Sequence, residues 1–171
     1  AMFDAKEQGG NCFRFYTAEM NARTERRLTL ETGLRHALER GEFLLHYQPQ
    51  VDLVSGEILG AEALIRWQHP DWGLVSPAEF VSLAEETGLI LPIGEWVLAE
   101  ACTQARIWHD AGYAGLRIAV NLSGRQLAQK NLVETVAATL TRCAVARGVL
   151  ELEITESLLM QDLEQTAGTL E

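Results

Sequence analysis

A carboxylate and a guanidinium lie on one face of a predicted strand, in the stretch from Ile58 to Trp67. Successive side chains of a strand alternate between its two faces, so Glu62, Leu64 and Arg66 share one surface. At a rise of about 3.3 Å per residue, Glu62 and Arg66 lie about 13 Å apart, too far for an ion pair. This spacing suits a metal ion at Glu62 and an anion at Arg66. The alternative is a half-exposed strand that carries ordinary surface charges.

Two later predicted strands also carry polar residues on one face. Asn121 lies in the strand 116–123, opposite an apolar face, and Glu151 and Glu153 share one face of the strand 150–155. A parallel strand covered by helices on both sides has nearly continuous apolar residues, and these strands do not. We therefore expect Glu62, Asn121 and Glu153 to point into a common interior.

Two carboxylates and an amide are hard oxygen ligands, which Mg²⁺ and Mn²⁺ prefer and zinc does not. The alternatives are that Asn121 caps the next helix, and that Glu151 or Glu153 faces solvent on an edge strand.

Length and composition restrict the class of protein. With 171 residues, 47% of them hydrophobic, the chain can bury the core of one domain, or of one domain with a fragment of another. The net charge of −10 argues against binding of a nucleic acid polymer, but it leaves room for a small anionic ligand held by metal ions.

Cys12, Cys102 and Cys143 are widely spaced, which predicts neither a disulfide framework nor a zinc site and indicates the reducing cytoplasm. No apolar run approaches the roughly 20 residues that cross a bilayer, so we expect no membrane contact from this segment; any anchor would lie outside it.

The remaining pattern predicts helices alternating with strands. A charged, solvated helix over 18–40 leads to a hairpin of strands 43–51 and 58–67, and the sequence Ser76-Pro77-Ala78-Glu79 predicts a capping box that starts a helix ending at Thr87. Further helices are predicted over 92–111 and 127–146, flanking the strand 116–123. Strand–helix alternation predicts parallel strands in an α/β layered or barrel fold.

Four short motifs follow one another along the chain: Tyr47-Gln48-Pro49, Glu62-Ala63-Leu64 followed by Ile65-Arg66, Asn121-Leu122-Ser123, and Glu153-Ile154-Thr155-Glu156. Their order and spacing resemble those of the EAL domain, the bacterial cyclic di-GMP phosphodiesterase, from about Leu28 to the end of the sequence. Ala1 to Phe15 resembles the C-terminal tail of a GGDEF domain, through the stretch from Ala5 to Asn11.

The resemblance implies a modified (β/α)₈ barrel that hydrolyses cyclic di-GMP to linear pGpG with two Mg²⁺ or Mn²⁺ ions. It implies that Glu62, Asn121 and Glu153 are metal ligands. It also implies that Gln48, Leu64 and Arg66 form the substrate site, with Arg66 at a phosphate. Glu62, Glu153 and Glu156 would be the catalytic residues, with Glu156 steadying a loop beside the metals.

The resemblance also predicts a domain arrangement: a GGDEF tail over 1–16, a linker helix and the start of the EAL domain over 17–41, and a truncated EAL domain over 42–171. The family's later motifs, which include further metal ligands, are absent from this sequence. We therefore expect an incomplete barrel, about the first half, that is inactive by itself and forms a homodimer through its open strands. The alternative is a non-catalytic module that binds cyclic di-GMP or mediates dimerisation or regulation.

Overall fold

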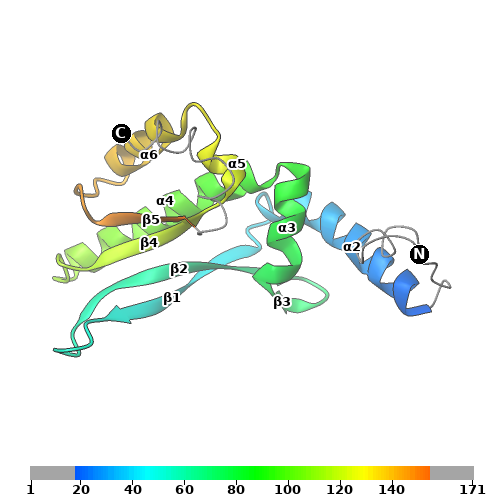
Figure 1. Cartoon of the computed structure of the whole chain (residues 1–171), viewed down its shortest axis with the longest axis horizontal. Helices are drawn as coiled ribbons and strands as arrows, with labels where there is room; N and C mark the ends of the chain where they lie inside the picture. The colour runs from blue at the N-terminus through cyan, green and yellow to red at the C-terminus, as the bar shows by residue number, and fades with distance from the viewer. Residues whose placement is uncertain (1–17, 155–171) are drawn as a thin grey trace, which may run out of the picture.

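The computed structural model of this chain describes residues 18–154, which form a mixed sheet with helices packed on one side (Figure 1). The strands are β1 (Phe43–Val51), β2 (Ile58–His69), β3 (Gly73–Val75), β4 (Arg117–Leu122) and β5 (Leu150–Ile154). The helices are α2 (Ala18–Ala37), α3 (Pro77–Thr87), α4 (Ile90–Asp110), α5 (Gly124–Leu127) and α6 (Leu132–Arg142). None of the helices in this part of the chain has an apolar stretch long enough to span a bilayer.

The sheet has the strand order β1-β2-β4-β5, and β3 pairs with β2 outside this path. β1 and β2 form an antiparallel hairpin, whereas β2–β4 and β4–β5 are parallel pairs. Parallel neighbours need a crossover connection, which α3 and α4 supply between β2 and β4, and α5 and α6 supply between β4 and β5. The predicted hairpin and the predicted parallel strands of an α/β fold are therefore confirmed.

The hairpin turn is built by Asp52. Its Oδ1 accepts hydrogen bonds from the backbone N–H groups of Ser55 at 2.7 Å and Val54 at 2.9 Å, and Gly56 adopts a φ of +74° that favours glycine. These hydrogen bonds, first that of Ser55 and then that of Val54, lower the pKa of the Asp52 carboxyl. Leu53 and Val54 at the tip are 96% and 98% exposed, so the hairpin end projects as an uncovered apolar surface.

The core lies between the sheet and helices α2, α3 and α4. Its fully buried side chains are mostly large and apolar: Trp67, Phe80, Leu34, Ile93, Leu98, Ile118, Val75 and Val120. Phe43 joins the strands to the helices, because its ring contacts Trp67, Phe80 and Trp96 at centroid distances of 6.0, 5.9 and 5.9 Å.

The middle of β1 packs on α4 through Tyr47, whose ring meets the ring of Trp108 edge-on at 5.2 Å. Burial, with a smaller contribution from the charge of Glu100, raises the pKa of Tyr47 to about 12. Trp96 and Trp108 therefore pack against the core, as the helical spacing predicts.

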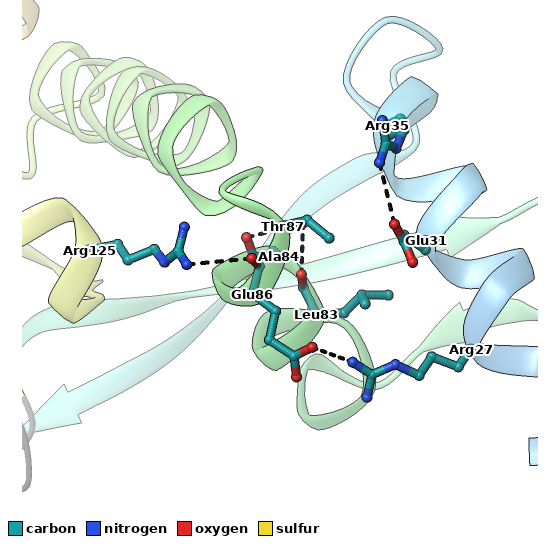
Figure 2. Close-up of polar contacts among 8 residues, drawn as sticks. All are labelled: Arg27, Glu31, Arg35, Leu83, Ala84, Glu86, Thr87 and Arg125. Carbon is teal, nitrogen blue, oxygen red and sulfur yellow. Dashed lines mark hydrogen bonds and ion pairs between the residues drawn. The ribbon is translucent and has the colours of Figure 1, made fainter. Parts of the chain in front are cut away.

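The charged half of α2 is exposed over residues 24–29, as the sequence predicted, and its arginines also contact α3; Figure 2 shows Arg27 beside Glu86. Arg26 pairs with Glu79 at 2.8 Å, and Arg27 pairs with Glu86. Glu86 also links α3 to α5, since its backbone carbonyl accepts a hydrogen bond from Arg125 at 3.4 Å. These exposed ion pairs contribute little to stability, and the position of α2 depends mainly on its buried residues Leu30, Leu34 and Ala37.

Three details of the predicted helices are wrong. The helix predicted over 127–146 is shorter, since α6 begins at Leu132 and ends at Arg142, and the sequence analysis did not predict the short α5 that Ser123 caps before it. Helix α3 starts after Ser76 and ends at Thr87 as predicted, but the capping box lacks its side-chain hydrogen bond, and Glu79 is paired with Arg26 instead. Helix α2 ends at Ala37, before the predicted residue 40.

Gly60 lies where β2 approaches β4 most closely. A Cβ placed on Gly60 would lie 2.5 Å from the carbonyl oxygen of Arg117, a backbone atom that cannot move aside. We expect Gly60→Ala to lower the free energy of unfolding by about 1–3 kcal/mol, measured by urea denaturation.

The matched control is Gly115→Ala, because a Cβ at Gly115 meets no atom within 4 Å. If Gly60→Ala and Gly115→Ala unfold at the same urea concentration, the close β2–β4 contact is not a stability constraint.

Candidate functional site

Glu62 and Asn121 meet on the face of the sheet opposite the core. Glu62 is in register with Ala119, and Asn121 follows on the same face of β4. This diagonal placement lets the Asn121 Nδ2 donate a hydrogen bond to the Glu62 Oε1 at 2.6 Å. The structure therefore brings together two of the three residues predicted to bind metal. The amide Oδ1 of Asn121 and the second carboxylate oxygen of Glu62 remain as acceptors.

Glu153 lies beside Asn121, with which it is in register across the β4–β5 pair. Its Oε1 accepts a hydrogen bond from the Nε2 of Gln50 at 3.3 Å. Gln50 belongs to β1 and Glu153 to β5, which lie at opposite ends of the strand path. Such a contact requires a curved sheet with the polar face on its concave side. Glu62, Asn121 and Glu153 therefore share one concave surface, and Asn121 does not cap α5, since Ser123 does.

The other predicted site residues are distributed around this surface. Gln48 is exposed and in register with Glu62 across the hairpin. Leu64 and Arg66 follow Glu62 on β2, and the Arg66 Nη1 donates a hydrogen bond to the Ile65 carbonyl at 2.8 Å. Glu156 lies outside the residues that the structure describes.

A pocket of about 330 Å³ opens where β2 and β4 separate beyond their last paired residues. Apolar side chains of α3 and α4, among them Phe80, Ile93 and Val97, form most of its wall. Polar groups line it from the strand ends, from α3 and from α5: Arg66, Asn121, Ser123, Glu85 and Gln126. An apolar cleft with a few convergent polar groups is the usual form of a small-molecule site.

Gln126 is a pocket residue that the sequence analysis did not identify. It is 4% exposed, and its Oε1 accepts hydrogen bonds from the Ser123 N–H at 3.2 Å and the Ser123 hydroxyl at 2.8 Å. Together with the Ser123 Oγ contact to the Gln126 N–H, this forms the capping box of α5. The spacing Ser-x-x-Gln over 123–126 is a signal for such a box and could have revealed it.

The chemistry of the concave surface suits a hard divalent cation. The carboxylates of Glu62 and Glu153 and the amide oxygen of Asn121 are the ligand types that Mg²⁺ and Mn²⁺ prefer. Within residues 18–154, histidine, cysteine and acidic side chains form no cluster of three or more that could hold a metal ion. A site here would therefore have to include the amide of Asn121.

Comparison with known proteins identifies the family. The sequence profile described as EAL domain matches residues 31–171, which is most of the chain. The chain belongs to the EAL domain family. It is 48% identical over 171 residues to the bifunctional diguanylate cyclase/cyclic di-GMP phosphodiesterase MucR of Pseudomonas aeruginosa, covering 100% of this chain and 25% of MucR. It is 42% identical over 164 residues to the cyclic di-GMP phosphodiesterase PdeR of Escherichia coli, covering 96% of this chain and 24% of PdeR.

Solved EAL structures have the same fold. The PaMucR phosphodiesterase in complex with c-di-GMP superposes with a TM-score of 0.81 and 49% identity, over 83% of this chain and 57% of that one. The Xanthomonas citri FimX EAL domain in complex with c-diGMP gives a TM-score of 0.75 and 28% identity, over 88% of this chain and 58% of that one. The predicted α/β fold, part of a TIM-like barrel, is confirmed. The chain spans about a quarter of its curated relatives and little more than half of these solved EAL chains.

Gly94 of α4 supports the pocket wall formed by Gln126. A Cβ at Gly94 would lie 2.0 Å from the Gln126 Nε2, so Gly94→Ala must displace the amide that caps α5. We expect this variant to lose about 1–3 kcal/mol of unfolding free energy, measured by urea denaturation.

The control is the same change in a Gln126→Ala background, where no amide remains to be displaced. There we expect Gly94→Ala to cost less than half as much. Equal costs in the two backgrounds would show that Gly94 and Gln126 are not coupled.

Proposed function

We propose that this chain binds cyclic di-GMP and belongs to a domain that hydrolyses it to linear pGpG with two Mg²⁺ or Mn²⁺ ions. The observation that carries the proposal is the arrangement of Glu62, Asn121 and Glu153 on one concave surface, beside a pocket that contains Arg66. The relatives named as cyclic di-GMP phosphodiesterases, and the c-di-GMP complexes of similar folds, support it.

The charges of this surface explain how an acidic chain can bind an anion. The chain has a net charge of −10, and two carboxylates lie where the phosphodiester would approach. Bound divalent ions reverse the sign of the local charge, polarise the phosphoryl oxygen and lower the pKa of bound water. Glu62, Asn121 and Glu153 would hold these ions through oxygen atoms.

Arg66 would bind the phosphate and the pocket would receive a base. The guanidinium offers paired N–H donors that match two phosphate oxygens. The apolar walls formed by Phe80 and Ile93 suit the faces of a purine, and the amide of Gln126 offers a polar contact to its edge. We propose that Gln48 and Leu64 complete this site, and that Glu156 steadies a loop beside the metals.

We propose a parent protein of several domains. The match to MucR includes residues 1–16, and MucR is named as a bifunctional diguanylate cyclase and phosphodiesterase, which supports a GGDEF tail in these residues. Residues 17–41 would then be the linker helix and the start of the EAL domain, and 42–171 the rest of the EAL segment. We place this segment in the cytoplasm.

The binding proposal is tested by isothermal titration of the chain with cyclic di-GMP in the presence of Ca²⁺, which occupies oxygen sites. We expect saturable binding that is lost with EDTA, and Arg66→Ala should weaken it about tenfold or more by removing the bidentate phosphate contact. Arg35→Ala is the control, because Arg35 is exposed on α2 and pairs with Glu31 at 3.3 Å (Figure 2).

Chromatography of the nucleotide products separates catalysis from binding. With Mn²⁺, we expect the 171-residue chain to turn over cyclic di-GMP negligibly, since it spans only 57% of the PaMucR phosphodiesterase chain. The alternative, a regulatory module that binds cyclic di-GMP, also predicts binding without turnover. The two are distinguished by a longer form that includes the remaining part of the domain: the enzyme should then be active, and the regulatory module should stay inactive. Absence of binding even at millimolar nucleotide would contradict the proposal.

We also propose that the chain forms a homodimer. β1 and β5 are the edges of the sheet within residues 18–154, and the hairpin tip exposes Leu53 and Val54. Unpaired strand edges and apolar patches favour pairing with another chain. Light scattering at micromolar concentration should give twice the 18.9 kDa mass of one chain, and a stable monomer would contradict this.

A further inference from the structure

Gln50 contacts a proposed metal ligand from the far side of the sheet. Its Nε2 lies 3.3 Å from the Oε1 of Glu153, although 103 positions separate the two residues in the chain and β2 and β4 lie between their strands. Both side chains are partly buried on the concave surface. We propose that Gln50 is a positioning residue that holds the carboxylate of Glu153 for metal binding; this inference rests on the proposed function.

The hydrogen bond fixes one oxygen of Glu153 and leaves the other free. A glutamate side chain has several rotamers in solution, and a ligand that is already oriented loses less entropy when the ion binds. Because Oε1 accepts from Gln50, Oε2 is the oxygen left for a cation, and Asn121 is the neighbour of Glu153 in β4. Hydrogen bonds to ligating carboxylates commonly set metal affinity in this way.

The neighbouring glutamate shows why the donor is neutral. Glu151 lies on the same face of β5 and pairs with Arg117, whose positive charge compensates it. Glu153 receives its hydrogen bond from an amide, which orients the carboxylate and leaves its negative charge available to a cation. The two acidic residues of β5 therefore differ in role: Glu151 is part of an ion pair between strands, and Glu153 is prepared for a metal ion.

The inference extends the site to β1 beyond Gln48. Gln48 and Gln50 lie on the same face of β1, and Gln48 is opposite Glu62 whereas Gln50 reaches Glu153. One strand thus supplies a glutamine to each end of the carboxylate set. The curvature that brings Gln50 to Glu153 also makes this contact sensitive to the shape of the sheet.

The test is a titration of the whole chain with Mn²⁺ up to millimolar concentration. The electron paramagnetic resonance signal of the free ion measures how much Mn²⁺ remains unbound. Gln50→Leu keeps the size of the side chain and removes its donor, and we expect it to raise the dissociation constant for Mn²⁺ about tenfold. The matched control is Gln68→Leu, because Gln68 is an exposed glutamine of β2 paired with Leu74. We expect Gln68→Leu to bind Mn²⁺ with the dissociation constant of the wild type. We also expect Gln50→Leu and Gln68→Leu to have the same midpoint of thermal unfolding.

A double variant shows whether Gln50 acts through Glu153. In a Glu153→Gln background, Gln50→Leu should leave the already weakened affinity for Mn²⁺ unchanged. An unchanged affinity in Gln50→Leu alone, or the same tenfold loss in both backgrounds, would overturn the inference while the proposed function stands. Failure of the wild-type chain to bind Mn²⁺ would instead overturn the metal site of the proposed function, and the inference with it.

Discussion

The parallel pairing of β2 with β4 is the constraint on which the candidate site depends. Only the residues from Gly60 to Ala63 are in register with β4, and this short pairing places Glu62 diagonally from Asn121. The absence of a side chain at Gly60 permits the close approach of the two strands. Beyond Ala63 the strands separate, and the pocket that contains Arg66 occupies the space between them. One pairing thus determines both the carboxylate–amide contact and the adjoining pocket.

The two faces of this sheet differ in composition and in role: one packs against the helices, and the other carries the candidate site. The apolar face binds α2, α3 and α4 through Trp67, Ile118 and Val120, and this burial provides the stability of the fold. The concave face carries acidic residues whose mutual repulsion must be offset. The three glutamates there each have a donor: Asn121 for Glu62, Gln50 for Glu153 and Arg117 for Glu151. Hydrogen bonding therefore organises these charges in the described structure, and divalent ions would complete their compensation.

The alternation of polar and apolar residues predicted much of this arrangement because the period of a strand depends only on the backbone. It placed Glu62 on the face of Arg66, and the paired strands confirm the hairpin 43–51 with β2. It could not predict the contact of Gln50 with Glu153, since that contact depends on the curvature of the whole sheet. The separate helix α5 was not predicted because four residues are too few to show a helical period, although Ser123 and Gln126 carry a capping pattern. At Ser76 the same kind of pattern predicted a capping box that does not form, because Glu79 binds Arg26 of α2, a helix distant in the sequence.

The central claim is that Glu62, Asn121 and Glu153 form one metal site of a cyclic di-GMP phosphodiesterase domain. Its most direct test is anomalous X-ray diffraction from crystals of this chain grown with Mn²⁺ and cyclic di-GMP. The account predicts an anomalous peak about 2.0–2.4 Å from oxygen atoms of Glu62 and Asn121, with Glu153 at the same or an adjacent ion and a phosphate within reach of Arg66. A Mn²⁺ peak elsewhere on the chain, with this concave surface holding only water, would contradict it.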